Sequence, residues 1–185
     1  MIDSIKKIFN LSEEDGLDAN LCLCTNMDTD GEDGIWFTLE LLRPTATKDE
    51  LLAEIHGTIF LAKNIIYNLV DFADWMDGVS ADKGTAGAFM IEFYEKNYCN
   101  PRTVYPGSVM YVHEINLIAS DTQKEARGVI LDNVGEIYKR CTGEKPGVVV
   151  MLFSESEKDI EEYSWEEYQI SDKNMTCYVD VSGVC

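Results

Sequence analysis

The stretch from Ser120 to Gly128, SDTQKEARG, contains residue types that suit the binding of a phosphate group. It follows VMYVHEINLIA, whose alternation is typical of a strand, and it precedes DNVGEIYKRC, whose apolar residues recur at helical spacing. A turn that leads from a strand into a helix presents the first N–H groups of the helix, at the positive end of its dipole. Such groups bind anions. The stretch therefore predicts a site for a phosphate-bearing cofactor.

The same stretch also has the composition of an ordinary helix N-terminus. Ser120, Asp121 or Thr122 would serve as the N-cap, and Glu125 would complete a capping box. A capping box satisfies the same N–H groups that a pyrophosphate needs. The two interpretations therefore compete for one set of donors.

Metal-binding patterns elsewhere in the chain are weak. His56, His113 and the cysteines of CLC (residues 22–24) do not have the spacing of a zinc site. The segment NMDTDGEDG, residues 26–34, begins with the rhythm of a calcium loop, but Phe37 stands where the bidentate Glu would be, and its flanks look like strands. We expect an acidic hairpin turn there and no metal site.

The charge of the chain is strongly negative and unevenly spread. The 34 acidic and 15 basic residues give a formal net charge of −19. Ser12–Glu40 carries nine acids and no Lys or Arg, Ser154–Asp172 carries eight acids and Lys158 alone, and Ser120–Lys145 is neutral with five of each sign. Such a field repels nucleic acid and anionic membranes and attracts cationic partners. Alternatively, the acidic runs serve only solubility.

Length and composition indicate one compact domain that spans residues 1–185, with 45% hydrophobic residues available for a core. The first residues, MIDSIKKIFN, contain no apolar signal segment. The longest apolar run, VVVMLF, is too short to cross a bilayer. We expect a soluble, cytoplasmic protein.

The order of elements predicts an α+β fold in which one mixed, mostly antiparallel sheet has helices on both faces. Residues 47–55 are ambiguous between a short helix and the approach to a strand, and a break near Gly84 divides the helical region 71–98. The other expected strands are 21–27, 35–43, 56–68, 109–119, 148–153 and 175–181, and the other expected helices run from about Gln123 to Cys141 and over 154–168.

The C-terminal half resembles the core of the GNAT acyltransferase superfamily. Its phosphate turn follows the pattern Gln/Arg-x-x-Gly-x-Gly/Ala, which here reads Gln123-Lys-Glu-Ala126-Arg-Gly128 and is followed by three apolar residues. Ala126 stands where the first Gly of the pattern would be. The resemblance covers residues 101–185 as the cofactor-binding half, and residues 1–100 by element order alone. It implies acetyl-CoA or another acyl-CoA as the cofactor.

The resemblance also implies which residues hold this cofactor. The backbone N–H groups of the strand end around Ile118 would bind the pantetheine arm and polarise the thioester carbonyl. The residues that would hold the pyrophosphate are Gln123, Lys124, Ala126, Arg127 and Gly128.

Catalytic roles follow from the same resemblance. Glu114, expected on one strand face with Asn116 and Ile118, would accept the proton of the amine directly or through water. Tyr168, or Tyr163 about one turn earlier, would protonate the leaving thiolate. The structural alternatives are a pairing of Glu114 with His113 or a neighbouring strand, and simple packing of the tyrosines.

The sequence therefore predicts an acyl-CoA-dependent N-acyltransferase of GNAT type that acts on a cationic amine, either a small molecule or a peptide. The neutral segment around the turn and its strand–turn–helix context favour this function. The alternative is a non-catalytic acidic GNAT-like protein that binds a basic partner or mimics the charge of a nucleic acid. Ala126 and the net charge favour that alternative.

Overall fold

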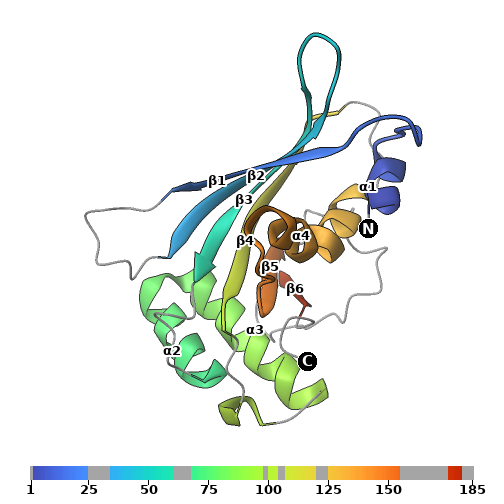
Figure 1. Cartoon of the computed structure of the whole chain (residues 1–185). Helices are drawn as coiled ribbons and strands as arrows, with labels where there is room; N and C mark the ends of the chain where they lie inside the picture. The colour runs from blue at the N-terminus through green and yellow to red at the C-terminus, as the bar shows by residue number, and fades with distance from the viewer. Residues whose placement is uncertain are drawn as a thin grey trace.

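Six strands of the protein form one sheet, against which the helices pack (Figure 1). The computed structural model describes residues 2–24, 34–60, 68–97, 100–103, 107–119, 125–154 and 175–180. In chain order the elements are α1 (Ile2–Ile8), β1 (Asp18–Cys24), β2 (Ile35–Arg43), β3 (Glu50–Phe60), α2 (Leu69–Val79), α3 (Ala81–Asn97), the 3-10 helix η1 (Pro101–Thr103), β4 (Val109–Leu117), α4 (Ala126–Thr142), β5 (Val148–Ser154) and β6 (Met175–Asp180).

The strands lie in the sheet in the order β1-β2-β3-β4-β5-β6. All neighbours are antiparallel except β4 and β5, which are parallel. Parallel neighbours need a crossover connection, and α4 lies in the connection between these two strands. The prediction of a mixed, mostly antiparallel sheet with helices, in the α+β class, is confirmed.

One face of the sheet is covered by α1 and α4, which Figure 1 shows side by side. Alternate residues of the strands point into this core, because successive side chains of a strand face opposite sides. The helix α4 contributes the stripe expected from its apolar spacing. Buried members of this cluster include Ile5, Ile8, Leu39, Ile55, Met110, Val112, Ile130, Val134 and Ile137.

The opposite face is covered at one end by α2 and α3, which lie at the lower end of the sheet in Figure 1. The sheet contributes Phe60, Val109, Tyr111, Val148, Val150 and Cys177 to this second cluster. Phe60 packs edge-on against both Phe72 and Trp75 of α2. The described helices thus lie on both faces, as the sequence predicts.

The break between α2 and α3 is at Ser80, and the prediction of a break near Gly84 was wrong. The Ser80 N–H donates to Met76 O, and its hydroxyl accepts from the Lys83 N–H at 3.3 Å. Ser80 therefore ends one helix and caps the next. Gly84 lies inside α3, where a Cβ atom would be 2.2 Å from the Asp77 carboxylate. The absence of a Cβ atom at Gly84 therefore allows α2 and α3 to approach closely, and this glycine is not part of a turn.

Two other boundaries are decided by the structure. Residues 50–55, left open between helix and strand, belong to β3. The helix α4 begins at Ala126, three residues later than expected, and ends at Gly143, whose φ of 88° is left-handed. The acidic turn and the helix expected over 154–168 lie outside the described residues, although β1 and β2 pair as expected on either side of the turn.

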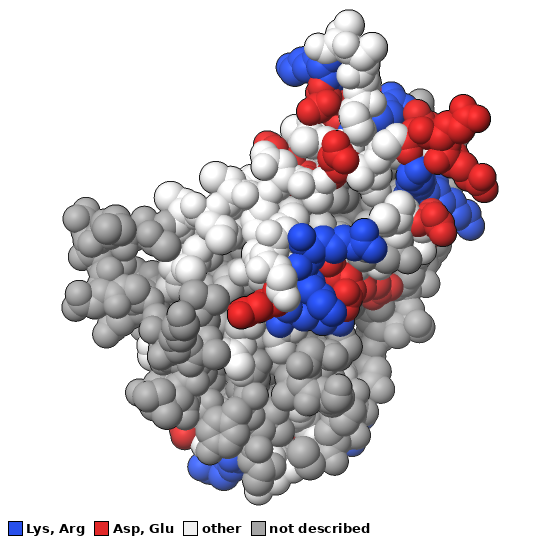
Figure 2. All heavy atoms as spheres, in the orientation of Figure 1, with Lys and Arg blue, Asp and Glu red and all other residues white. Residues whose placement is uncertain are grey.

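Basic and acidic side chains are mixed over α4, as Figure 2 shows. The last turn of α4 carries Lys139 and Arg140. Lys145 Nζ lies 3.0 Å from Glu136 Oε1, and the hydrogen bond and charge of this ammonium lower the pKa of Glu136. Charges of the predicted neutral segment thus compensate one another locally. Among the helices described, none is both long enough and apolar enough to cross a membrane.

Gly57 provides a test of the packing between β3 and β4. A Cβ atom at this position would lie 2.3 Å from Tyr111 O and 2.5 Å from the Phe37 ring. Gly57→Ala should therefore lower the free energy of unfolding by about 1–3 kcal/mol, the usual cost of overpacking. Gly78 of α2 has no atom within 4 Å of an added Cβ. Gly78→Ala, the matched control, should be neutral or stabilise the protein by up to about 1 kcal/mol.

Denaturant unfolding measures both effects as shifts of the midpoint. A wild-type midpoint for Gly57→Ala would show that β3 does not approach β4 and β2 as closely as described.

Candidate functional site

β4 and β5 are paired over only part of their length. Their parallel ladder runs from Val109–Val148 to Val112–Met151. β4 continues to Leu117, and in the described part of the chain its later residues pair with β3 alone. The two parallel strands therefore part at their carboxyl ends, on the side from which the chain enters α4.

A β-bulge at His113 sets the direction of the residues that follow it. Glu114 lies opposite His56 and Val112 lies opposite Gly57, so His113 is one residue too many in β4. Val112 and Ile115 are both buried in the cluster under α1 and α4, although they are three positions apart. The bulge thus turns Glu114 away from this core and leaves it exposed.

The backbone at the end of β4 presents its polar groups in alternate directions. The N–H groups of Ile118 and Ala119 both donate to Leu52 O, at 2.9 and 3.1 Å, so β3 engages them. By alternation, Ile115 and Leu117 direct their N–H and C=O groups to the side that β5 leaves. Consistent with this, Arg127 Nε donates to Ile115 O at 3.4 Å.

The Ile118 N–H, predicted to bind the cofactor, is therefore occupied by β3. The N–H of Leu117, which was not among the predicted site residues, points to the side that β5 leaves.

Glu125 does not have the position that the predicted capping box gives it, and the predicted N-cap residues Ser120, Asp121 and Thr122 lie outside the described residues. Glu125 is itself the N-cap residue, and its side chain makes no capping hydrogen bond. The first turn contains no acidic residue. The methyl group of Ala126 is fully buried in the core cluster, so it points toward the sheet and not along the helix axis, where the first N–H groups point. The helix end therefore keeps the properties of an anion site.

The predicted site residues are only partly brought together. Arg127 is half-buried and reaches β4, while Ala126 and Gly128 are buried in the same helical turn. Glu114 lies on the opposite face of β4 from α4. Gln123, Lys124, Tyr163 and Tyr168 lie outside the described residues.

His56 lies beside Glu114 and was missed as a possible site residue. Its Nδ1 is 3.2 Å from Thr38 Oγ1, and its Nε2 is 3.7 Å from Glu54 Oε2. The order Val112-His-Glu-Ile115, in which two polar residues between apolar ones break the alternation of a strand, was the signal for the bulge that places Glu114 beside His56. No three His, Cys, Asp or Glu side chains gather into a metal site within the described ranges.

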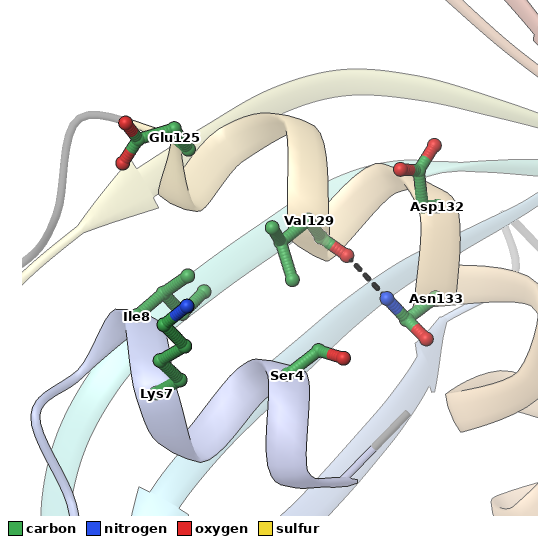
Figure 3. A pocket seen from close by; sticks show the side chains of 7 residues that line it. All are labelled: Ser4, Lys7, Ile8, Glu125, Val129, Asp132 and Asn133. Atoms are coloured by element: carbon green, nitrogen blue, oxygen red, sulfur yellow. Dashed lines mark hydrogen bonds between the residues drawn. The ribbon is translucent and has the colours of Figure 1, made fainter.

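A surface pocket of about 510 Å³ lies between α1 and α4 (Figure 3). It is lined by Ser4, Lys7 and Ile8 of α1 and by Glu125, Val129, Asp132 and Asn133 of α4. Two carboxylates against one ammonium disfavour a phosphate ligand. Because none of its lining residues comes from β4 or β5, the pocket is separate from the place where these strands part.

Comparison with known proteins finds no protein-family model, no curated protein and no solved structure that matches the chain.

The absence of a side-chain cap on α4 can be tested directly. Because the Glu125 side chain caps nothing, Glu125→Ala should change the free energy of unfolding by no more than about 0.5 kcal/mol. Asn68 does cap α2, where its Oδ1 accepts from the Val70 and Asp71 N–H groups at 3.0 and 3.1 Å. Asn68→Ala, the matched control, should cost about 1 kcal/mol. Chemical denaturation of both variants measures the difference, and equal losses would restore the capping interpretation.

Proposed function

We propose that the protein is an acyl-CoA-dependent N-acyltransferase of GNAT type that acts on a cationic amine. The main observation behind the proposal is that the parallel strands β4 and β5 are not paired beyond Val112 and Met151. Backbone groups of β4 that would otherwise bond to β5 are thereby directed at a ligand. Polar backbone groups need such partners.

The end of β4 fits the amide-rich arm of an acyl-CoA. The N–H groups of Ile115 and Leu117 point to the side that β5 leaves, so they can pair with a chain of amides as a further strand would, while Ile115 O accepts from Arg127. These groups would hold the arm along the end of β4.

The start of α4 fits the pyrophosphate of the same molecule. Its first N–H groups have no acceptor within the helix, the N-cap Glu125 carries the nearest carboxylate of the described helix start, and Arg127 adds a positive charge beside the end of β4. Ala126 does not obstruct these groups, because its methyl group is buried in the core. The residues described here therefore fit the cofactor that the resemblance implies.

When bound, an acyl-CoA supplies an activated acyl group as its thioester. Glu114 would take the proton from the attacking amine nitrogen, directly or through water, because its carboxylate is exposed on β4 next to the bulge. The amine nitrogen forms a bond to the acyl carbon, the carbon–sulfur bond breaks, and the departing sulfur takes up a proton. Tyr168 or Tyr163 remains the proposed source of that proton.

The alternative function is a non-catalytic acidic protein on a GNAT-like scaffold, which binds a basic partner or mimics nucleic-acid charge. The net charge of −19 favours it. The two functions differ in what the start of α4 binds, so a titration with acetyl-CoA separates them.

Acetyl-CoA should raise the melting temperature of the protein, because a ligand of the native state stabilises it by mass action. Arg127→Ala should weaken the binding of acetyl-CoA by at least about fivefold, or roughly 1 kcal/mol. Arg140→Ala, which removes the same charge from the other end of α4, is the matched control and should bind normally. Calorimetry measures both affinities. No binding by the wild type at millimolar acetyl-CoA would favour the non-catalytic alternative.

Glu114→Gln should lower kcat by about 10²–10⁴-fold, the usual contribution of a general base. The affinity for acetyl-CoA should stay unchanged, because Glu114 lies on the other face of β4 from α4. Glu92→Gln removes an exposed carboxylate from α3 and is the control, with a wild-type rate expected. Steady-state kinetics with product detection by mass spectrometry measures the effect. A wild-type kcat in Glu114→Gln would return this residue to a structural role.

A further inference from the structure

The described helices cover only part of the face of β1–β4 that lies opposite α1 and α4. On this side the described residues of α2 and α3 pack against Phe60, Val109 and Tyr111, at one end of β3 and β4. Beyond them the side chains are mostly exposed or half-buried. We call this surface the open face; the strand register places on it Asn20, Cys22, Cys24, Trp36, Thr38, Glu40, Glu54, His56, Thr58, His113, Glu114 and Asn116.

A stacked pair of rings forms a platform at one end of the open face. The rings of Trp36 and His113 are 5.1 Å apart and nearly parallel, with an interplanar angle of 9°. Tyr111 holds His113 edge-on at 4.6 Å, and Thr58 Oγ1 lies 2.8 Å from His113 Nε2. Trp36 nevertheless remains 48% exposed. The Trp36 indole stacks on His113 and remains exposed to solvent, which suits the binding of a cation or an alkyl chain.

Two carboxylates lie one and two steps further along the same face. In the register, Trp36 lies opposite Thr58, whereas Glu114 lies opposite His56, the next residue of β3 on this face, and Glu54 follows His56. Residues two apart in a strand are separated by roughly 6.6 Å. Neighbouring strands add about 4.8 Å each, so the Cα atoms of Glu114, two strands across and one step along, and of Glu54, one strand across and two steps along, lie roughly 12 and 14 Å from that of Trp36.

No positive charge on these strands offsets the carboxylates. β1, β3 and β4 contain no Lys or Arg, and Arg43, the single basic residue of β2, pairs with Glu50 at the far end. Glu40 accepts a hydrogen bond from Asn20 Nδ2 at 2.8 Å, which leaves Glu54 and Glu114 as the stronger attraction for a ligand cation.

We propose that the open face binds a small unbranched alkyl diamine. One ammonium group lies over the exposed face of Trp36, and the methylene stem crosses Thr38 and His56. The second ammonium lies between Glu54 and Glu114, where Glu114 accepts its proton before transfer. The inference deepens the proposed function, on which it rests, because it names the acceptor and its binding surface.

Other ligand classes fit this surface less well. On the four strands an anion would meet three carboxylates and no basic residue except Arg43, which pairs with Glu50. A neutral alcohol would desolvate Glu54 and Glu114 without compensating their charge. A monoamine has one ammonium group, so with this group at the carboxylates only its alkyl chain contacts the indole and the cation–π attraction is lost.

Calorimetric titration with cadaverine, at low salt and without acetyl-CoA, tests the inference. The wild type should bind cadaverine in a saturable manner and at least about tenfold more tightly than pentylamine, since each loss of 1.4 kcal/mol is tenfold in affinity. Trp36→Leu, Glu54→Gln and Glu114→Gln should each weaken binding by about fivefold or more. Because all three side chains are exposed or half-buried, the variants should fold normally, which their melting temperatures check.

Glu13→Gln is the matched control, because it removes an exposed carboxylate from the loop between α1 and β1. It should bind cadaverine as the wild type does. Equal weakening in Glu13→Gln and Glu54→Gln would show diffuse attraction to an acidic surface and would overturn the inference. Binding of a lysine-containing peptide without binding of cadaverine would also overturn it.

The binding of cadaverine and the binding of acetyl-CoA are measured separately, so the inferred amine site and the proposed function can be contradicted separately. If acetyl-CoA binds through Arg127 but cadaverine does not bind, the inferred diamine acceptor is wrong, and the proposed acyltransferase function is not contradicted. If cadaverine binds as expected and acetyl-CoA does not, the amine site stands and the acyltransferase is wrong.

Discussion

The double burial of β4 is the constraint from which the positions of the helices follow. Met110 and Val112 point into the cluster under α1 and α4, while Val109 and Tyr111 point into the cluster under α2 and α3. A strand with apolar side chains on both faces is stable only when both faces are covered. Because β5 is parallel to β4, the connection between them crosses one face, and α4 provides the cover there. The helices α2 and α3 cover the other face.

This double burial ends where the candidate site begins. Up to Val112, β4 has a parallel partner on one edge and an antiparallel partner on the other. At His113 the strand bulges, and beyond it the pairing with β5 stops. The two changes have different consequences. The loss of β5 leaves the backbone groups of Leu117 directed to the edge that β5 no longer occupies, whereas the bulge turns the Glu114 carboxylate away from α4. In the proposed mechanism, cofactor and acceptor would therefore approach β4 from opposite sides.

The two faces of the sheet also differ in the charges that they carry. On the α4 side, acids and bases alternate and pair, as Lys145 does with Glu136. On the open face, carboxylates occur on strands that contain almost no basic residue. A strongly negative surface costs some stability through self-repulsion, and its benefit is the attraction of cations. The mixed charge over α4 lowers the local repulsion that an anionic cofactor would meet.

The sequence by itself determined the elements whose signals are local. Alternation predicted β2 and β4, helical spacing predicted α4, and the run of apolar residues predicted β5, because these patterns reflect burial on one or two faces. It also predicted the class of the sheet. It did not predict that Ser80 rather than Gly84 divides α2 from α3, since the glycine is required by the approach of the helices, which is a contact between elements. The tertiary structure alone decided where β4 and β5 part, which N–H groups Leu52 engages, and how the bulge brings Glu114 beside His56. Those features depend on pairing between strands that are far apart in the chain, and a single strand's side-chain pattern does not record its partners.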